Sequence, residues 1–211
     1  MKITKFGHCC LLIEDKGKRI LTDPGNFSNL QDDVKNIDII LITHEHPDHI
    51  HIESLQKILI NSPKALIVTN TSTSKLLVPL NIPFEILEDG SEKEFLGIQI
   101  SAHGMLHEEV YSTIPRVQNT GFYISNKLFY PGDAFTIPGF SVDILALPVA
   151  GPWVKLSDSI TYALKVKPRI SFPVHDGMLI SGGSAHALPN KILGENGIEF
   201  KVLEIGKEYE F

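Results

Sequence analysis

The chain has 211 residues, of which 43% are hydrophobic and 21% charged, a balance typical of a globular protein and not of a disordered one. Its formal net charge of −6 and the lack of a long Lys or Arg cluster argue against broad attraction to nucleic acid or anionic lipid. The length suits a single domain that spans residues 1–211.

The N-terminal segments predict strands at 1–6, 9–14 and 19–22, with a turn at Gly17. The adjacent Cys9 and Cys10 would point to opposite faces of their strand, so we expect two reduced thiols and no disulfide between them. The apolar stretch at 9–13 soon meets charged residues and predicts no signal peptide, and no apolar run approaches the roughly 20 residues of a membrane span. We therefore expect a cytoplasmic protein with no membrane partner.

The next segments alternate buried strands with helices. The continuous apolar run at 38–42 predicts a strand buried on both faces, and 65–69 predicts another. Apolar residues at positions 52, 55, 58 and 59 follow a helical period, and 72–78 predicts a second, shorter helix. Strands at 84–87, 94–96 and 98–102 follow, with a turn at Asp89-Gly90 between the first two.

The second half repeats the order of strands first and helices later. A hairpin around Asn126 joins strands at 121–125 and 127–130, and buried strands follow at 143–147 and 169–173. Helices are predicted at 157–166, capped by Ser157, and at 184–193, before a closing pair of strands at 198–204 and 208–211. This order fits an α+β protein with two sheets packed face to face and helices outside.

One short segment carries four potential metal-binding side chains. The run Thr43-His44-Glu45-His46-Pro47-Asp48-His49 lies in a loop between the strand at 38–42 and the next helix, where α/β enzymes usually place their chemistry. Imidazole nitrogens and a carboxylate oxygen suit Zn²⁺, and also Mn²⁺ or Fe²⁺. Packing several partly charged imidazoles side by side is costly without a metal, which disfavours the alternative of a solvated His-rich loop.

This segment resembles the His-x-His-x-Asp-His signature of the metallo-β-lactamase superfamily. Gly7-His8 followed by Thr22-Asp23-Pro24-Gly25 is similar to the opening of the lactonase-like branch of predicted metal-dependent hydrolases. Pro131-Gly132-Asp133 resembles the Gly-Asp element of the superfamily, and Pro173-Val174-His175-Asp176 resembles its final histidine. The resemblance covers nearly the whole chain and implies a four-layer αβ/βα sandwich that acts as a metal-dependent hydrolase.

The resemblance also implies two divalent metal ions, with zinc as the first expectation and manganese or iron as alternatives. One ion would be held by His44, His46 and a histidine that follows the strand at 98–102. The other would be held by Asp48, His49 and His175. Asp133 would bridge the two, because a shared carboxylate and a shared hydroxide offset the repulsion between neighbouring cations.

Two histidines compete for the third position on the first ion. The superfamily usually places this ligand just beyond a strand, and counting from Gly97 favours His107. His103 continues the strand and would instead pack against or support the site. Loss of metal in His103→Ala but not in His107→Ala would reverse the assignment.

His8 and Asp23 are candidates for groups that orient the ligand imidazoles or contact the substrate. They come from different early strands, and the resemblance places both beside the metals. The alternative for each is a hydrogen-bonded turn residue. We expect His51 and His186 on the exposed surfaces of helices.

The loop after the strand at 143–147 offers two further candidates, Trp153 and Lys155. If the loop lies on the side of the molecule that carries the metals, both side chains would contact a substrate. The equal alternative is that the tryptophan is buried and the lysine is solvated. Arg116 is a candidate anion-binding group, and Asp176 is expected to cap a turn.

The expected chemistry is hydrolysis by a hydroxide that bridges the two metals and attacks an electrophilic carbonyl or phosphorus. Metal coordination lowers the pKa of bound water toward neutrality, and Asp48 is the candidate catalytic residue for handling protons. The lactonase-like resemblance favours a small anionic ester, lactone or phosphoester as the substrate.

Two other functions stay open at this stage. A metal-dependent nuclease or phosphodiesterase of the same fold is disfavoured by the acidic chain and by the lack of a basic insert. A non-hydrolytic iron redox or metal-sensing protein would be distinguished by iron in the site and by oxygen-dependent chemistry.

Overall fold

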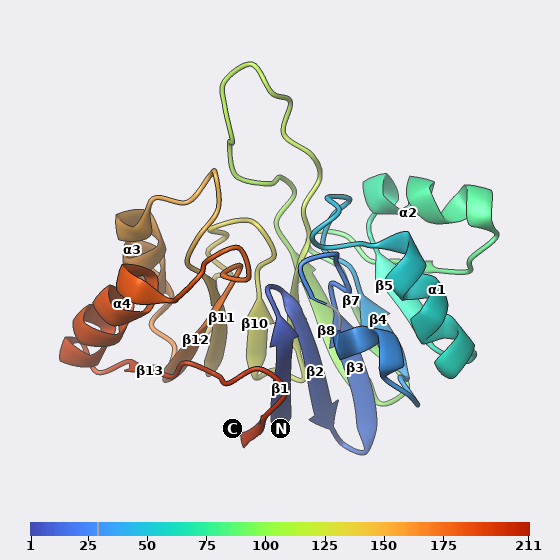
Figure 1. Ribbon diagram of the computed structural model, residues 1–211, viewed down its shortest axis with the longest axis horizontal. Helices are drawn as coiled ribbons and strands as arrows, with labels where there is room; N and C mark the ends of the chain where they lie inside the picture. The colour runs from blue at the N-terminus through green and yellow to red at the C-terminus, as the bar shows by residue number, and fades with distance from the viewer. Residues whose placement is uncertain (29) are drawn as a thin grey trace.

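The computed structural model describes residues 1–28 and 30–211 and shows two seven-stranded sheets packed face to face between two pairs of helices (Figure 1). Helices α1 and α2 lie on one side of the sandwich, and α3 and α4 lie on the other. The bounds of the helices, including two short 3-10 helices, are α1 (Ile52–Asn61), α2 (Thr71–Leu77), α3 (Leu156–Val166), α4 (Gly183–Glu195), η1 (Leu30–Asp33) and η2 (Val78–Leu80). The predicted α+β four-layer sandwich is confirmed.

The first sheet has the strand order β14-β1-β2-β3-β4-β5-β6. Its strands are β1 (Lys2–Gly7), β2 (Cys10–Asp15), β3 (Lys18–Thr22), β4 (Ile39–Leu41), β5 (Leu66–Thr69), β6 (Glu85–Ile86) and β14 (Glu208–Glu210). Pairing is antiparallel from β14 to β3 and parallel from β3 to β6. The parallel strand β4 is buried along its whole length, as its apolar run predicts.

The second sheet has the order β13-β12-β11-β10-β9-β8-β7 and mirrors the first. Its strands are β7 (Glu92–Phe95), β8 (Ile98–His103), β9 (Gly121–Ile124), β10 (Leu128–Tyr130), β11 (Ile144–Pro148), β12 (Ile170–Val174) and β13 (Glu199–Phe200). Pairing is antiparallel from β7 to β10 and parallel from β10 to β13. The predicted hairpin around Asn126 joins β9 to β10.

Three apolar clusters hold the four layers together. The central cluster lies between the sheets and joins residues of both, such as Ile13 and Ile39 of the first and Phe122 and Phe172 of the second. A second cluster packs α3 and α4 on the second sheet, and a third packs α1 on the first sheet. Each sheet is therefore covered on both faces, which leaves the strand ends as the place for polar side chains.

The predicted closing pair of strands at 198–204 and 208–211 is wrong. β13 is only two residues long and pairs with β12, whereas β14 pairs with β1 in the other sheet. The chain between them crosses from one sheet to the other: Lys201 N donates to Ser171 O at 2.8 Å, and Gly206 N donates to Lys5 O at 2.8 Å. β13 and β14 each pair with a strand that is distant in sequence, so they do not pair with each other.

Two local predictions also need correction. α3 begins at Leu156 with Lys155 at the N-cap, so Ser157 lies inside the first turn, and its Oγ donates to Asp158 Oδ1 at 3.2 Å and caps nothing. The turn at Asp89-Gly90 exists, but the strands on either side of it, β6 and β7, belong to different sheets.

A long arm, residues 104–120, rises beyond the ends of the strands (Figure 1). Its base is a narrow two-stranded ribbon: His107 N donates to Val117 O at 3.0 Å, and Asn119 N donates to Met105 O at 3.2 Å. Tyr111 and Ile114, nearer the tip, are exposed. In the described part of the chain, every helix is too short or too polar to reach across a lipid bilayer.

Candidate metal centre

The loop between β4 and α1 carries His44, His46, Asp48 and His49. It turns tightly, because His49 N and Ile50 N both donate to His46 O at 2.9 Å. Gly25 from the neighbouring loop packs directly on it, and a Cβ at Gly25 would lie 1.8 Å from Asp48 O. Only glycine fits there, so the Thr22-Asp23-Pro24-Gly25 element supports the shape of the His-rich loop.

Two groups of potential ligands meet at this end of the sandwich. The first joins His44, His46, His107 and Asp133, with one ligand atom from each residue within 4.8 Å of all the others. His44 Nε2 lies 3.1 Å from His46 Nδ1, and His107 Nε2 lies 3.2 Å from Asp133 Oδ2. The set of three nitrogens and one oxygen suits zinc, manganese or iron.

The second group joins Asp48, His49, Asp133 and His175 within the same 4.8 Å limit. His49 Nε2 lies 3.1 Å from Asp133 Oδ1, and His175 Nε2 lies 2.9 Å from Asp133 Oδ2. His175 Nε2 also lies 3.4 Å from Asp48 Oδ2. Asp133 belongs to both groups and is the residue that connects them.

The hydrogen bonds of the histidines leave nitrogen atoms free to bind a cation. His49 Nδ1 lies 2.7 Å from Asp23 Oδ2 and His107 Nδ1 lies 2.6 Å from Glu108 O, so both rings carry their proton on Nδ1. His44 Nδ1 lies 3.0 Å from Thr43 Oγ1 in the same way. With a proton on Nδ1, Nε2 of each ring is the atom that can bind a cation, which is how metal-binding histidines are usually oriented.

Buried polar atoms without a hydrogen-bond partner test the fit of the residues to a cation. Within the described residues, His49 Nε2, Asp133 Oδ1 and both ring nitrogens of His175 make no well-directed hydrogen bond, although both Nε2 atoms lie close to Asp133 oxygens. Unpartnered buried polar atoms are costly and rare in native proteins. Their convergence on one point fits a bound divalent cation.

The charges of the centre agree with this fit. Burial lowers the pKa of His44 well below its usual value, and His49 beside it adds to the effect. Burial also opposes protonation of His175, but Asp133 outweighs it and raises the pKa of His175 to about 10. Asp133 itself is buried, yet His49 and His175 hold its pKa well below the usual range. The buried carboxylate therefore favours positive charge next to it, which a divalent cation would supply.

Asp23 lies behind the second group. It accepts hydrogen bonds from His49 Nδ1, from Thr43 N at 2.8 Å and from the hydroxyl of Tyr130 at 2.7 Å. A carboxylate on the far nitrogen of a ligand histidine fixes its tautomer and ring direction. Tyr130 is a contributor that the sequence did not predict, because its strand reads as ordinary core.

His8 and Trp153 contact the two carboxylates. His8 Nδ1 accepts from Gly177 N at 3.1 Å, so the proton is on Nε2, which lies 3.1 Å from Asp48 Oδ2. Trp153 is buried and its Nε1 donates to Asp133 Oδ2 at 3.1 Å. The sequence predicted His8 beside the metals and left Trp153 either against a substrate or buried, but it did not predict the bond to Asp133.

The structure does not bring His103 or Lys155 to the centre. His103 Nε2 lies 2.8 Å from Ser101 Oγ, and its ring packs against Phe140 on the outer side of the second sheet. Lys155 is exposed where α3 begins. Arg116 lies at the base of the arm and donates from Nε to His107 O, so it supports the segment that carries His107.

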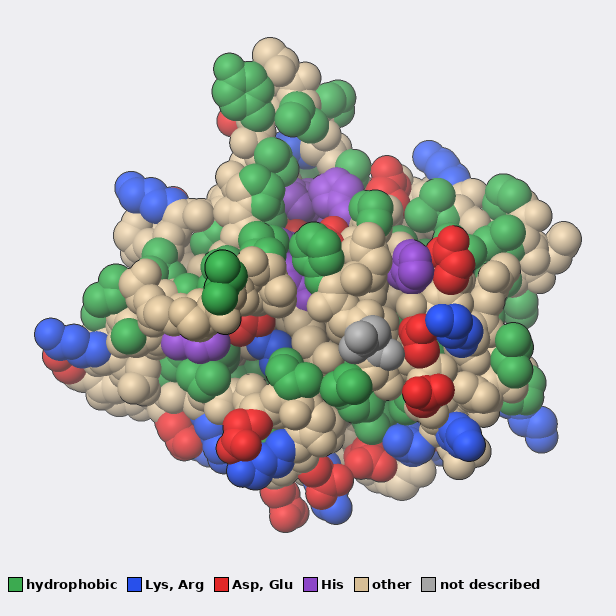
Figure 2. All heavy atoms as spheres, viewed as in Figure 1, with side chains coloured by type: hydrophobic (Ala, Val, Ile, Leu, Met, Phe, Trp, Pro, Cys, Tyr) green, Lys and Arg blue, Asp and Glu red, His purple; other side chains and the backbone are tan. Residues whose placement is uncertain are grey.

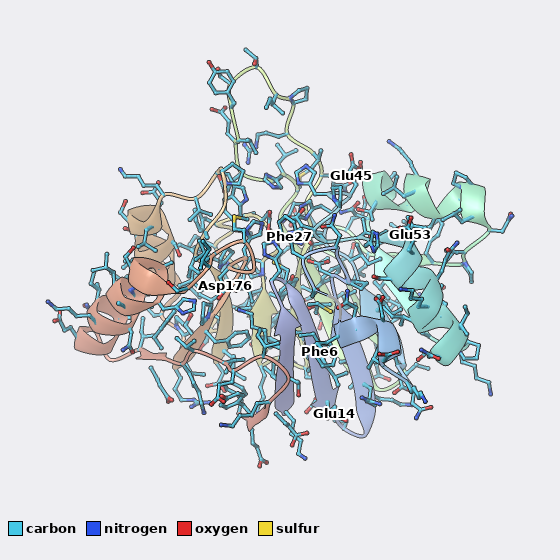
Figure 3. All side chains as sticks on the ribbon, in the orientation of Figure 1. Phe6, Glu14, Phe27, Glu45, Glu53 and Asp176 are labelled. Atoms are coloured by element: carbon cyan, nitrogen blue, oxygen red, sulfur yellow. The ribbon has the colours of Figure 1, made fainter. Side chains whose placement is uncertain are left out.

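A buried ion pair that the sequence did not predict lies beside His175. Lys5 is almost fully buried, and its Nζ donates to Pro173 O at 2.8 Å and to Asp176 Oδ1 at 2.5 Å. Asp176 Oδ2 lies 2.8 Å from His186 Nε2, and Figure 3 shows Asp176 on the side of α4. Asp176 and His186, expected at a turn and on a helix surface, instead fix the segment that follows β12.

A cavity of about 420 Å³ opens above the two groups. Figure 2 shows histidine side chains at the bottom of a hollow below the arm, with hydrophobic side chains around it. Besides ligand residues, the cavity is lined by Asn26, Phe27, Pro47, Val110, Pro152, Trp153 and Met178. Of the described residues, no lysine or arginine lines it.

Comparison with known sequences gives a consistent picture. Residues 2–175 match the beta-lactamase superfamily domain. Protein Rv0786c of Mycobacterium tuberculosis is 34% identical over 184 residues, which cover 85% of each chain. A UPF0173 metal-dependent hydrolase of Thermoplasma volcanium is 30% identical over 190 residues, which cover 83% of each chain.

Comparison with solved structures supports the same fold. Igni18, a metallo hydrolase from Ignicoccus hospitalis, superposes with a TM-score of 0.78 at 20% identity. The match covers 100% of this chain and 98% of that chain. The whole sandwich, not only the metal-binding end, is therefore shared.

Proposed function

The chain belongs to the beta-lactamase superfamily, among the UPF0173 metal-dependent hydrolases, and from this premise we propose that it uses two divalent cations, zinc first, to hydrolyse a small uncharged ester or lactone. The observation that carries the proposal is the position of Asp133. Its Oδ2 lies 3.2 Å from His107 Nε2 of the first group, and its Oδ1 lies 3.1 Å from His49 Nε2 of the second group.

One cation would be held by His44, His46, His107 and Asp133, and the other by Asp48, His49, Asp133 and His175. A divalent cation bound there lowers the pKa of coordinated water toward neutrality and polarises the bond to be cleaved. The shared carboxylate supports two cations over one, because it offsets the repulsion between them.

Asp48 is the candidate for proton movement. It lines the cavity, its side chain is 20% exposed, and Asp133 is the other carboxylate among the described lining residues. His8 Nε2 donates to Asp48 Oδ2 and keeps the carboxylate directed at the cavity. We assign Asp48 the transfer of a proton between water and the leaving group, in addition to its place in the second group.

The cavity walls support an uncharged substrate with an apolar part. Phe27, Val110, Trp153 and Met178 present apolar surface, and the polar atoms of the site belong mostly to the ligands. An anionic phosphoester would find no lysine or arginine among the described lining residues to balance its charge. The anionic substrate that the sequence resemblance favoured is therefore replaced by a neutral ester or lactone in this proposal.

Two free, buried cysteines support a reducing location, and we propose the cytoplasm. The expected partner there is a small molecule, because the cavity has a volume of about 420 Å³ and is lined by residues of the arm and of the loop that carries Trp153.

Metal analysis followed by activity assays tests the proposal. The purified chain is expected to hold two equivalents of zinc and to hydrolyse aryl esters and lactones faster than phosphodiesters. A chelator should abolish the activity, and added zinc should restore it. His46→Ala should lose most activity, whereas His51→Ala, at the end of the same loop but outside both groups, should not.

Two outcomes would contradict the proposal. Full metal occupancy without turnover of any ester, lactone or phosphodiester would argue against a hydrolase of this class. Native iron together with oxygen consumption would favour the redox alternative.

A further inference from the structure

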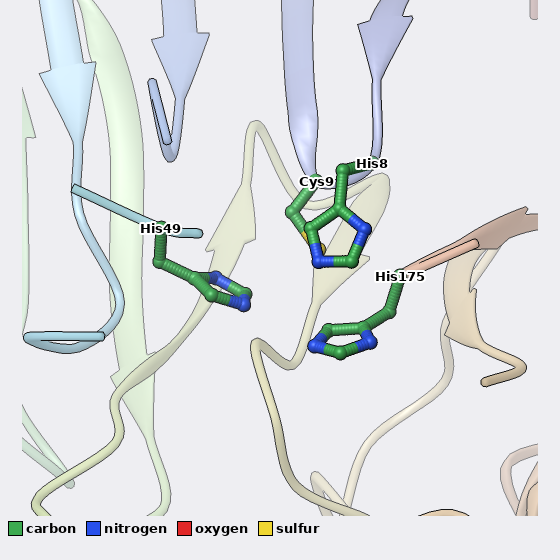
Figure 4. A group of neighbouring side chains, drawn as sticks. All are labelled: His8, Cys9, His49 and His175. Carbon is green, nitrogen blue, oxygen red and sulfur yellow. The ribbon is translucent and has the colours of Figure 1, made fainter. Parts of the chain in front are cut away.

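A third group of side chains overlaps the second metal-binding group. It consists of His8, Cys9, His49 and His175, with one ligand atom from each within 4.8 Å of the others, and all four residues are buried (Figure 4). The third group keeps His49 and His175 and replaces the two carboxylates with a sulfur and another imidazole. Its donors are therefore softer than those of the second group.

Cys9 is the new chemical element of this group. It is a free thiol with 2% exposure, on the turn between β1 and β2. Cys10, the next residue, is also free and buried, but it packs in the cluster beneath α1, whereas Cys9 packs in the cluster between the sheets. Only Cys9 faces the histidines, so the pair provides its own control.

Two of the histidines have buried nitrogen atoms that make no well-directed hydrogen bond in the described chain. These are His49 Nε2 and both ring nitrogens of His175, of which the two Nε2 atoms lie close to the Asp133 carboxylate. His49 Nδ1 is held by Asp23, which leaves Nε2 as the binding atom. One ligand nitrogen of each ring lies within 4.8 Å of the Cys9 sulfur.

His8 is less available than the other three. Its Nδ1 accepts from Gly177 N, so its Nε2 carries a proton and donates to Asp48. Binding through Nε2 would require His8 to give up both hydrogen bonds. Cys9, His49 and His175 are therefore the three residues available to bind a cation.

We propose that Cys9, His49 and His175 form an alternative position for the second cation, taken by thiophilic divalent ions such as cadmium and cobalt in place of the carboxylate-containing second group. The two positions exclude each other, because they share His49 and His175. Occupation converts the Cys9 thiol to a thiolate, and the released proton passes to water. Hard cations such as manganese stay with Asp48 and Asp133, so the hardness of the ion decides between the two positions.

Cobalt titration of the complete chain tests the proposal by absorption spectroscopy. A thiolate bound to cobalt gives a strong sulfur-to-metal charge-transfer band in the near ultraviolet, which nitrogen and oxygen ligands do not give. The band is expected to grow with the second equivalent of cobalt. Cys9→Ala should lose at least nine-tenths of the band, and Cys10→Ala should keep it.

Two results would overturn the proposal: no charge-transfer band in the wild-type chain that binds two equivalents of cobalt, or a band that survives in Cys9→Ala. If Cys9→Ala does not fold, the cadmium NMR spectrum of the wild-type chain decides without any substitution. A resonance shifted downfield, as thiolate ligation requires, supports the site, and a resonance typical of nitrogen and oxygen ligands refutes it.

The inference shares its histidines with the proposed hydrolase centre but can fail separately. The group of His44, His46, His107 and Asp133 does not include Cys9, so chelator-sensitive ester hydrolysis would survive a negative cobalt result. Full metal occupancy without hydrolysis of any ester or lactone would instead argue against the hydrolase proposal and leave the Cys9 position untouched.

Discussion

The candidate ligand histidines differ in the group that binds the ring nitrogen facing away from the centre. A backbone carbonyl holds His107, a hydroxyl holds His44, and a carboxylate holds His49. A carboxylate makes the imidazole more basic and restricts its rotation more than a neutral acceptor does. His49 should therefore be the ligand most sensitive to the residue behind it.

Asp23→Asn tests this sensitivity. The amide keeps the size of the side chain but removes its charge, so affinity at the second group should fall by about 10- to 100-fold, while the first group keeps its affinity. Competition titrations with a metal indicator measure both steps. Asp38→Asn, a carboxylate that pairs with Lys18 away from the centre, is the matched control. An equal loss at both steps would contradict the assignment of Asp23 to His49.

Trp153 is the only tryptophan of the chain, and it touches Asp133. Its ring centroid lies 5.5 Å from that of His107 and 5.6 Å from that of His175. Cation binding at either group should therefore change the intrinsic fluorescence, and the change should be complete at two equivalents. Trp153→Phe removes the only tryptophan and serves as the control for emission from other sources. Equilibrium dialysis measures metal binding in parallel. Tryptophan emission that stays unchanged while metal binds would contradict the contact with Asp133.

Prediction from sequence worked best for residues whose chemistry is local. The four candidate ligands between positions 44 and 49 are neighbours in the chain, and the structure brings them together with His107, Asp133 and His175. Lys5 could not be recognised, because a lysine in a strand looks like a surface residue. Its partner Asp176 is 171 positions away. The hydrogen bond from Trp153 to Asp133 was not predicted either, because the two residues lie in separate loops 20 positions apart.

Among the elements, β1 and the segment after β12 are connected by the Lys5–Asp176 ion pair. A buried ion pair adds little net stability, because desolvation of the charges offsets their attraction. Removal of one partner is different, since the other charge stays buried. The pair therefore matters most for keeping the segment that carries His175 in place.

Lys5→Met is expected to cost about 3–5 kcal/mol in the free energy of unfolding, because Asp176 would lose its charged partner in a buried site. Urea unfolding followed by circular dichroism measures this. Lys2→Met, on the same strand but exposed in its pair with Glu208, should change the midpoint little. A midpoint in Lys5→Met as high as that of Lys2→Met would contradict the structural role of the pair.

Element prediction failed where strand partners are distant. The segment at 198–204 has the composition of a strand, yet the chain there must pass from the second sheet to the first, and only Glu199–Phe200 pairs. Serine is a residue type that often caps helices, but α3 begins at Leu156, one residue before Ser157. Local propensity describes which conformation a segment tolerates, whereas the register of the neighbouring strands decides where the element begins and ends.

At the scale of the molecule, the proposed centre joins the two halves. His44 to His49 follow a strand of the first sheet, whereas His107, Asp133 and His175 follow strands of the second. The halves also share the central apolar cluster. The arrangement of two sheets with outer helices could be predicted from the order of strands and helices, because each half repeats it.

Removal of the metals should lower the stability of the whole chain. A cation held at about 100 times its dissociation constant stabilises the folded state by about 2.7 kcal/mol, and two cations would roughly double this. Thermal unfolding with and without a chelator is expected to show a lower midpoint for the metal-free chain. His46→Ala should show a smaller difference between the two conditions. An identical midpoint with and without chelator would mean that the proposed ligands hold no cation.

The arm has a consequence for engineering. The backbone bonds at its base, between His107 and Val117 and between Met105 and Asn119, keep His107 in register however the chain continues beyond them. The tip around Tyr111 and Ile114 can therefore be shortened, lengthened or exchanged for another loop while the ligand stays where it is. A library of grafted tips would vary what the catalyst accepts without rebuilding the part that does the chemistry.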